Sequence, residues 1–466
     1  MQMSTGTRLK GLQAYGAIAQ LLFDPLSASR AITSRHGNFT EISLSTRKKR
    51  APIFHVVGSQ YAEQILKNYD TFRNGGIIVK GYRNSTHNHL RQGYFSANGA
   101  EYEHYIKLFG PLFRKKIVEE VYPVISEVVM DQLDRWPTDE VINIIPRINI
   151  LMKILASQGM FRDPDIVKGI HAANMVEQHG RLSGASLASL IAAKYGRPPF
   201  SKLHRQAKAT YDAIVDWGKT RDGFEAKSDV LSTITNAPDE FGQSASADRI
   251  AGYGWTMLGA SYDTSTSILT WLLVLIATHP DVARKLHEEV SGYDSISPSD
   301  ISVIMNLPFL DGVIKEALRL VPPAPIQRRK THTDTEILGH EIPVGSQMLI
   351  SAWMTNRDAV LYPDPDRFVP ERWSSISRSP YQWLTFSAGP RRCLGIWFAL
   401  AFLKTIIASV MARWQPEIPD GSAVSMKVAV TVRPGRELPV MLKRLDGNYR
   451  TSRLTGNIHK YLQIVD

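Results

Sequence analysis

Residues 386–395 read Phe386-Ser387-Ala388-Gly389-Pro390-Arg391-Arg392-Cys393-Leu394-Gly395 and contain the only cysteine of the 466-residue chain. One cysteine can form neither an intrachain disulfide nor a site built from several thiolates. A single thiolate can, however, be the proximal ligand of haem iron. That role needs backbone N–H groups turned toward the sulfur, which neighbouring glycines permit. The segment therefore favours a haem-thiolate site over a buried, inert thiol.

The residues around the cysteine suit the same role. Phe386 can shield the sulfur from water, and Arg391 can pair with a haem propionate. The spacing Phe-x-x-Gly-x-Arg-x-Cys-x-Gly resembles the cysteine-ligand loop of the cytochrome P-450 family, the haem-thiolate monooxygenases. The resemblance implies haem b as cofactor, with Cys393 as the iron ligand. It also implies cofactor contacts from Phe386, Gly389, Arg391 and Gly395.

Bulk properties narrow the class of protein. The net charge is +11 and 43% of the residues are hydrophobic, as in an ordinary globular protein. No basic tail or zinc-finger spacing supports nucleic-acid binding. The longest strongly apolar run, 268–277, is too short to span a bilayer, and the N-terminus has no cleavable signal pattern. We expect a cytoplasmic monomer that resembles the soluble bacterial members of the family.

The pattern along the chain predicts a mainly α fold with a smaller β-rich part. Residues 1–466 are expected to form one P-450 catalytic domain, with the haem between a long central helix and the cysteine loop. The β-rich part is expected at about 36–60 and 325–355 and in the C-terminal strands. The helical part is expected at about 100–320 and 394–413.

Several elements can be predicted individually. Alternation over 39–57 indicates a hairpin, and residues 80–100 read as a long polar loop. Residues 246–278 form a long helical pattern, apolar in its second half, as is typical of a buried central helix. Breaks are expected at 197–199 and 236–238. The remaining predictions are a helix over 307–320, a tight hairpin over 337–345 and a helix over 397–413.

Glu316 and Arg319 stand three residues apart and are therefore neighbours on one helix face. Alone, this spacing fits a surface ion pair of little value. Arg372 follows in the sequence Pro-Glu-Arg-Trp, before the cysteine loop. The resemblance implies that Glu316, Arg319 and Arg372 form a buried structural charge network behind the haem.

Asp263 and Thr264 lie midway along the long apolar helix, where polar side chains are unfavourable unless they are used. A hydroxyl that bonds back to the carbonyl one turn earlier is the simpler interpretation. The resemblance implies instead that this acid–alcohol pair delivers protons during oxygen activation. The family usually has glycine at the position of Ser261, which is small enough to fit there.

Further contacts to the haem propionates follow from the resemblance. Arg329 matches the propionate-binding arginine, with Arg328 as the alternative; an exposed strand arginine is the simpler interpretation. The family usually carries Trp or His, then Arg, on an earlier helix. This chain has Tyr102 and Ile106 there, and we expect Tyr102, His104 and Lys107 to take over those contacts.

The resemblance implies a monooxygenase that inserts one oxygen atom of O2 into an apolar molecule, such as a terpenoid, a fatty-acid-like or a polyketide-like compound of secondary metabolism. A haem-thiolate isomerase, dehydratase or peroxygenase remains an alternative, and a non-enzymatic haem sensor is a second one. The residues expected to line the substrate pocket are Trp255, Leu258, Gly259, Ala260, Ala324, Pro325 and Ile326.

Electrons are expected from NAD(P)H through an acidic ferredoxin or flavodoxin and its reductase. The basic charge of the chain fits such a partner, since opposite fields steer association. A scattered, solvated surface is the simpler interpretation. The side chains expected to form the docking surface are Lys107, Arg114, Lys115, Lys116 and Arg392.

Overall fold

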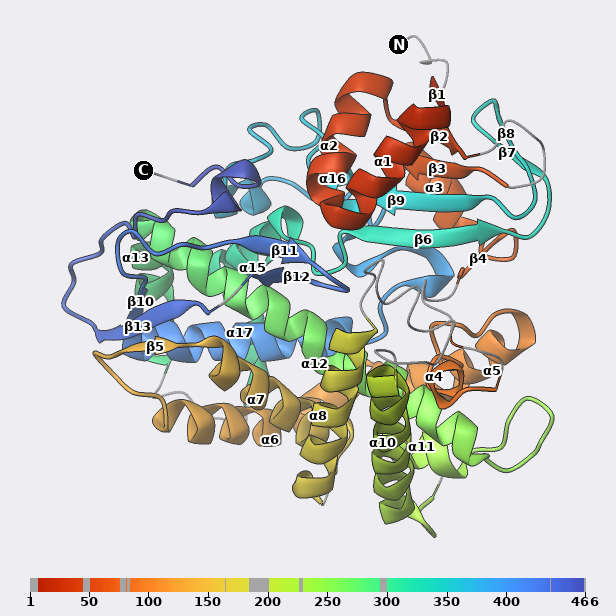
Figure 1. Ribbon diagram of the computed structural model, residues 1–466. Helices are drawn as coiled ribbons and strands as arrows, with labels where there is room; N and C mark the ends of the chain where they lie inside the picture. Colours follow the sequence, from red (N-terminus) through yellow and green to blue (C-terminus); the bar gives the residue numbers. More distant parts are fainter. Residues whose placement is uncertain are drawn as a thin grey trace.

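The computed structural model places a small β-rich part above a larger helical part (Figure 1). Helices α1 and α2 lie over the sheet, and α6, α7, α8 and α10 lie below it. Long helix α12 runs diagonally between them. The structure describes residues 7–44, 51–75, 81, 84–163, 165–183, 201–225, 229–293, 300–435 and 437–464. The predicted break at 197–199 lies outside these residues.

The main sheet has six strands in the order β1-β2-β3-β9-β6-β4. The predicted hairpin over 39–57 is confirmed, because β2 (Phe39–Ser43) and β3 (Ile53–Val56) pair antiparallel. β9 (Gln347–Ser351) joins β3 in parallel and β6 (Ile326–Thr331) antiparallel. The sequence therefore predicted the centre of the sheet.

Both edge strands of the main sheet lie outside the predicted ranges. β1 (Thr7–Lys10) and β4 (Phe72–Arg73) are very short. They become strands only because β2 and β6 offer free edges. A strand of four or fewer residues is too short to show the alternation of apolar and polar residues that predicts a strand.

Helix α12 (Ala247–Thr278) is 32 residues long, and the Ser246 side chain caps its N-terminus. Its second half, from 265 to 278, is buried on every side, as the apolar sequence predicted. Helix α15 (Pro308–Leu320) and helix α17 (Ile396–Arg413) also lie where helices were predicted. α12 carries Asp263, α15 carries Glu316 and Arg319, and α17 begins just after Cys393.

The β7–β8 hairpin shows why a short turn could be predicted. β7 (Thr335–Ile337) and β8 (His340–Ile342) pair antiparallel around Leu338 and Gly339, which both have positive φ. A two-residue turn of this kind matches the twist of the strands, and glycine adopts it without strain.

A three-stranded sheet corrects the predicted helical range. β5 (Val141–Asn143) lies inside 100–320, yet it pairs with β13 (Pro439–Arg444), which also pairs with β10 (Trp414–Glu417). The third β unit is the hairpin of β11 (Met426–Val428) and β12 (Val432–Pro434). The predicted polar loop over 80–100 likewise contains a short helix, α4 (Thr86–His89).

The remaining helices complete the framework. They are α1 (Gly11–Phe23), α2 (Pro25–His36), α3 (Ser59–Lys67), α5 (Gly99–Phe109), η1 (Gly110–Phe113), α6 (Lys115–Asp134), α7 (Ile145–Leu155), η2 (Ala156–Met160), α8 (Ile166–Leu182), α10 (Ser201–Gly218), η3 (Lys219–Arg221), α11 (Val230–Asn236), α13 (Pro280–Val290), α14 (Ile301–Met305), α16 (Ala352–Thr355), η5 (Pro370–Ser374), η6 (Leu384–Phe386), η7 (Gly389–Arg391) and η8 (Asn457–Lys460).

Two of the described helices, α12 and α17, are long and apolar enough to cross a membrane by length and composition alone. Most of each apolar stretch is buried inside the protein, 78% in α12 and 67% in α17. Their hydrophobicity is therefore that of core helices.

Two glycines let the segment before α5 lie directly against α12. A Cβ on Gly93 would stand 2.2 Å from the Gly252 carbonyl oxygen. A Cβ on Gly252 would stand 2.2 Å from the Gln92 carbonyl oxygen. Both obstacles are backbone atoms, which cannot move aside cheaply. The close approach fixes residues 84–94 beside α12.

We predict that Gly252→Ala lowers the free energy of unfolding by roughly 1–3 kcal/mol, because the added methyl overpacks this contact. Gly180→Ala is the matched control: Gly180 also lies in a helix, and a Cβ added there would meet no atom of the described residues within 4 Å. That control should be neutral or more stable, by up to about 1 kcal/mol. Denaturant unfolding measures both; equal stability of the two variants would contradict the prediction.

Candidate active site

The cysteine loop is closed by its own backbone. The Cys393 N–H donates to the Phe386 carbonyl at 2.8 Å. Ser387 and Gly389 both have positive φ, 58° and 68°. A Cβ on Gly389 would stand 2.2 Å from the Leu66 carbonyl oxygen of α3, so the loop passes too close for any side chain. Glycine is thus required at 389 by conformation and by space.

The thiol of Cys393 is both accessible and surrounded by protein. Its side chain is exposed to a water-sized probe, yet burial raises the pKa of the thiol above its usual value. A sulfur at the base of an open recess accounts for both. The Gly395 N–H and the charge of Arg392 oppose the rise in pKa. The N-terminus of α17 begins three residues later and adds positive potential.

The three residues predicted as a charge network meet around one buried carboxylate. Arg319 donates to both oxygens of Glu316, at 2.8 and 2.9 Å. The Arg372 Nε donates at 2.9 Å, and the Trp373 indole N–H also at 2.9 Å. The Val369 N–H adds a bond of 3.1 Å. Neither Glu316 nor Arg319 is exposed to solvent.

This network is tied to the cysteine loop by hydrogen bonds. Arg319 donates to the Asn356 carbonyl at 3.0 Å. The side chain of Asn356 donates to Thr385 at 3.2 Å and accepts from the Leu384 N–H at 2.9 Å. Thr385 in turn donates to the Leu318 carbonyl at 2.8 Å. The start of the loop is therefore fixed to α15.

A row of aromatic rings makes the same connection. Trp373, held by Glu316, lies 5.4 Å from the Trp383 ring. Trp383 lies edge-on to Phe386 at 5.6 Å. Phe386 is the residue expected to shield the sulfur. Its position thus depends on the buried carboxylate through two packed rings.

Two arginines gather near the cysteine loop with no carboxylate partner among the described residues. Arg329 is 7% exposed, and its side chain donates to the Arg328 carbonyl at 2.9 Å. Burial, then the charge of Arg391, lowers the pKa of Arg329 to about 10. Arg391 donates to the carbonyls of Tyr94 and Ala97 and to the Asn98 side chain. Buried positive charge of this kind suits an anionic ligand group.

Tyr102, which stands where the family usually has Trp or His, lies against the cysteine loop. Its hydroxyl donates to the Pro390 carbonyl at 2.6 Å, and the Arg391 guanidinium lies 3.4 Å over its ring. The propionate contacts expected of His104 and Lys107 stay predictions. His104 bonds the Pro238 carbonyl at 2.9 Å at the protein surface, and Lys107 is exposed. Both occupy other faces of α5 than Tyr102, which spacing on a short helix did not resolve.

Sequence reasoning missed Arg91. It is partly buried, and burial together with the charge of Arg328 lowers its pKa to about 10. It therefore adds positive charge to the side where Arg328 and Arg329 lie on β6. The only sequence signal was its place in the histidine-rich stretch Thr86-His87-Asn88-His89-Leu90-Arg91.

The middle of α12 is accessible on one stripe, whereas its second half is buried. The predicted pocket residues Trp255, Gly259 and Ala260 lie on this stripe, as do Ser261, Asp263 and Thr264. Ala324 and Ile326 are also accessible. Leu258 is fully buried in the core, because it lies on another face of the helix, and Pro325 is buried in its turn. The assignment of these two residues to the pocket stays a prediction.

The acid and the alcohol of α12 have different partners. The Thr264 hydroxyl donates to the Ala260 carbonyl one turn earlier, at 3.0 Å. Ser261 bonds the Leu258 carbonyl in the same manner. Asp263 pairs with Arg433 of β12 and accepts from Thr431 at 3.0 Å. No pattern in the sequence pointed to Arg433 or Thr431 as partners.

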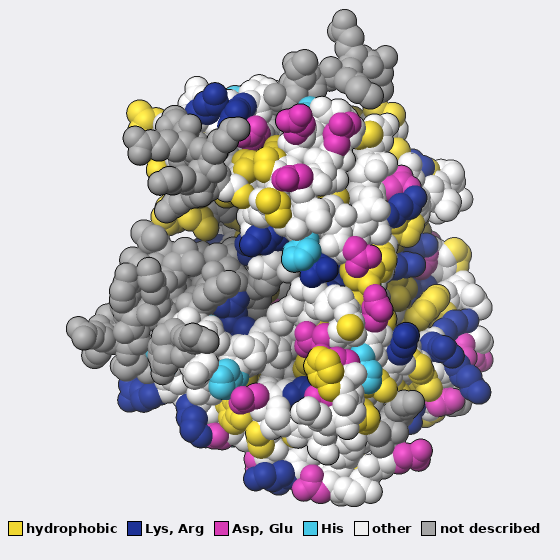
Figure 2. All heavy atoms as spheres, turned by 90° about the vertical axis from the view of Figure 1, so that its right-hand side faces the viewer, with side chains coloured by type: hydrophobic (Ala, Val, Ile, Leu, Met, Phe, Trp, Pro, Cys, Tyr) yellow, Lys and Arg dark blue, Asp and Glu magenta, His cyan; other side chains and the backbone are white. Residues whose placement is uncertain are grey.

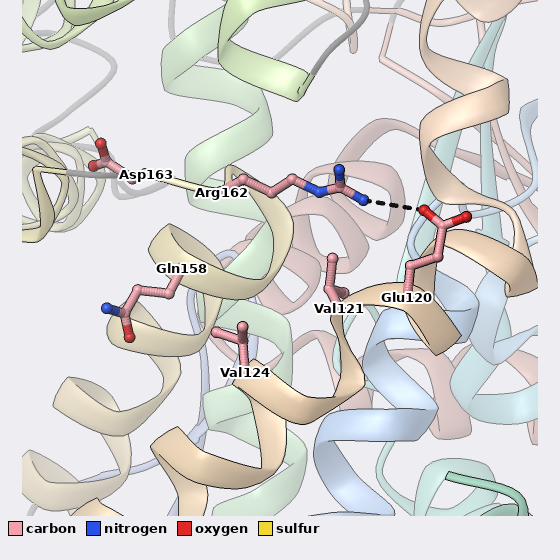
Figure 3. A pocket seen from close by; sticks show the side chains of 6 residues that line it. All are labelled: Glu120, Val121, Val124, Gln158, Arg162 and Asp163. Carbon is pink, nitrogen blue, oxygen red and sulfur yellow. Dashed lines mark ion pairs between the residues drawn. The ribbon is translucent and has the colours of Figure 1, made fainter. Parts of the chain in front are cut away.

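A surface groove of about 440 Å³ lies between α6 and the turn after η2. Figure 3 shows the side chains that line it. Glu120, Val121 and Val124 line one side, and Arg162 pairs with Glu120 at 3.6 Å across it. Its described lining residues include none from α12 or the cysteine loop. The groove is not part of the candidate active site.

The residues present fit a haem. The Cys393 thiol can supply an iron ligand, and the guanidinium groups of Arg329 and Arg391 can pair with two carboxylates such as the propionates. The sequence also matches the model of the family "Cytochrome P450" over residues 24–436. The chain belongs to the cytochrome P450 family. It is therefore an oxidoreductase that uses haem and incorporates oxygen from O2.

Two proteins with assigned names are similar to this chain over most of its length. "Cyclooctatin synthase" of Streptomyces melanosporofaciens is 26% identical over 87% of this chain and 89% of its own length. "Cyclooctat-9-en-7-ol 5-monooxygenase" of the same organism is 25% identical over 88% and 89%. Among solved structures, "Retinoic acid bound cyanobacterial CYP120A1" superposes with a TM-score of 0.79 at 20% identity, covering 96% of this chain and 100% of that one. This likeness shows that the fold is that of a P450.

We predict that Glu316→Gln destabilises this P450 by about 3–5 kcal/mol, because two buried arginine charges lose their partner. The control is Glu371→Gln. Glu371 pairs with Lys285 at 2.7 Å, but both side chains are largely exposed, at 45% and 43%, so the loss should stay below about 1 kcal/mol. Thermal unfolding and haem content of the purified variants measure the effect. Equal losses in the two variants would show that the Glu316 network does not hold the site.

Proposed function

We propose that this P450 is a cytoplasmic monooxygenase that hydroxylates or epoxidises an apolar terpenoid. The observation that supports this proposal is the accessible stripe of α12, where Trp255, Gly259 and Ala260 lead to Asp263 and Thr264. Two relatives along most of the chain carry the names of a cyclooctatin synthase and of a monooxygenase of cyclooctat-9-en-7-ol.

Bound haem, ligated by a thiolate, supplies the chemistry of O–O cleavage. The chain's own residues orient, shield and move protons. Cys393 serves as the ligand, Phe386 keeps water from it, and Tyr102 holds Pro390 and Arg391 in place. Arg329 and Arg391 hold the anionic edge of the cofactor.

Asp263 and Thr264 are proposed to deliver protons on the accessible side of α12. Thr264 is held by a bond to Ala260, which fixes its rotamer while leaving its oxygen free to accept. Asp263 is held by Arg433 and Thr431. The Thr431 hydroxyl donates to Asp263 and accepts from the Arg433 Nε at 3.0 Å, so both partners hold the carboxylate in one position.

We predict that Thr264→Val keeps substrate binding and reduction but releases most of the reducing equivalents as peroxide, because the proton donor beside O2 is lost. Thr270→Val is the matched control. Its hydroxyl bonds Thr266 in the same helix at 2.7 Å, but it is buried in the core. Peroxide formed per NAD(P)H consumed measures the coupling. Unchanged coupling in both Thr264→Val and Asp263→Asn would contradict the proposed path.

The alternatives predict different requirements. An isomerase, dehydratase or peroxygenase turns over without a reductase, and a sensor does not turn over at all. Turnover that needs both O2 and reductant separates the monooxygenase from each of them. The acid–alcohol pair favours the monooxygenase, since the isomerising and dehydrating reactions need no proton delivery to O2.

The electron donor is proposed to be an acidic ferredoxin or flavodoxin that receives its electrons from NAD(P)H. Arg114, Lys115 and Lys116 are exposed at the start of α6. This turn packs against the helix that follows the cysteine, since the Phe113 and Phe398 rings lie 5.9 Å apart. On the face in Figure 2, by contrast, basic and acidic side chains alternate.

We predict that Lys115→Glu/Lys116→Glu slows the first electron transfer from an acidic ferredoxin at least severalfold, with substrate affinity unchanged. Rising salt should slow the wild type too, since exposed charges are screened over roughly 8–10 Å. The control is Lys208→Glu/Lys219→Glu, which reverses two lysines of similar exposure on α10 and η3. Stopped-flow reduction measures the rates. If the wild type and both double variants are reduced at the same rate, with the same dependence on salt, the donor docks elsewhere.

A further inference from the structure

Histidines from three different elements gather near Trp255, which lies on the accessible stripe of α12. His87 of α4 and His179 of α8 share a hydrogen bond of 2.8 Å between Nδ1 and Nε2, and both are fully buried. The His204 ring of α10 lies 6.4 Å from that of His87. Trp255 of α12 lies edge-on to His179 at 5.7 Å.

In the neighbouring pair of His179 and Trp255, the His179 Nδ1 and the Trp255 Nε1 have no hydrogen-bond partner among the described residues. The indole nitrogen can only donate, whereas a neutral imidazole nitrogen donates or accepts according to its tautomer. Buried polar atoms are normally paired, so two neighbouring ones that lack a protein partner point to a ligand atom.

The position of Trp255 links these histidines to the proposed pocket. Trp255 is accessible and begins the stripe that continues to Gly259, Asp263 and Thr264. His179 lies behind it. Burial, together with the neighbouring His87 and the charge of Arg91, lowers the pKa of His179 to about 3. The His179 imidazole is therefore neutral at physiological pH and binds by hydrogen bonds.

A metal is not the natural occupant. The facing nitrogens of His87 and His179 are occupied by their mutual bond. In the described part of the chain, no group of three histidine, cysteine or carboxylate side chains has the arrangement of a metal site. An oxygen atom that accepts from Trp255 and bonds His179 satisfies both nitrogens at once.

We propose that Trp255 and His179 bind an oxygen group already present on the substrate. This inference rests on the proposed function and narrows its substrate to an oxygenated apolar molecule. Trp255 precedes Thr264 by nine residues, about 13 Å along the helix axis. The oxidised carbon is therefore remote from the anchored oxygen. An earlier step that installs oxygen, by oxidation or by capture of water during cyclisation, must supply such a substrate.

Binding to the haem-loaded protein tests the inference, with geranylgeraniol, geranylgeranoic acid and the hydrocarbon of the same skeleton as probes. The haem spectrum and calorimetry both report dissociation constants. We expect an oxygenated probe to bind about tenfold tighter than the hydrocarbon, the effect of one buried hydrogen bond. The alcohol and the acid separate a hydroxyl from a carboxylate as the preferred group, and either preference supports the inference.

Trp255→Phe keeps an aromatic ring and removes the donor, so it should abolish this preference. Trp353→Phe is the control, since the buried Trp353 indole nitrogen also lacks a partner among the described residues, but its ring stacks on Arg357. Equal binding of all probes by the wild type, or a preference that survives Trp255→Phe, overturns the inference and leaves the proposed function standing. If no probe binds, the proposed terpenoid class is wrong, and the inference fails with it.

Discussion

The part of the candidate site around Cys393 depends on the ion pairs and hydrogen bonds of the Glu316 carboxylate. One buried anion holds two arginines, an indole N–H and a backbone N–H. A buried charge is tolerated only when it is fully paired, so the four donors must stay in place together. Through Asn356 and Trp383 the same carboxylate determines where the cysteine loop begins.

The loop itself is shaped by the backbone. Gly389 passes the Leu66 carbonyl where no side chain fits, and the N–H of Cys393 closes the turn on Phe386. These constraints place the thiol just before the positive end of α17 and beside the charge of Arg392. The chemistry suits a haem because the loop offers a soft ligand, and Arg329 and Arg391 offer cations for its carboxylates.

Sequence reasoning succeeded where the signal lies within a few adjacent residues. The cysteine loop, the Glu316–Arg319 pair and the β7–β8 turn are local patterns with a direct physical meaning. It failed where the partner is far along the chain. Nothing in 141–143 predicts pairing with β13, and Thr431 meets Asp263 across 168 positions. Nor does the sequence of α5 show that Tyr102 bonds the cysteine loop while His104 bonds the Pro238 carbonyl.

The opposite side of the pocket is assembled almost wholly from such distant pieces. One residue comes from each of four helices: His87 from α4, His179 from α8, His204 from α10 and Trp255 from α12. Gly93 and Gly252 let the segment that follows α4 approach α12. The structure around Cys393 thus follows from a local sequence motif. The structure around Trp255 depends on packing between segments that are distant in the sequence. This division fits a family in which one chemistry serves many substrates.

The reduced carbon-monoxide complex tests the central claim, ligation of haem iron by Cys393, most directly. The wild type should absorb at the position typical of thiolate-ligated haem. Cys393→His should bind haem but absorb at the position typical of imidazole ligation, since imidazole donates less electron density. A Cys393→His protein that kept the thiolate-type band would contradict the claim, because no other cysteine exists in the chain to supply it.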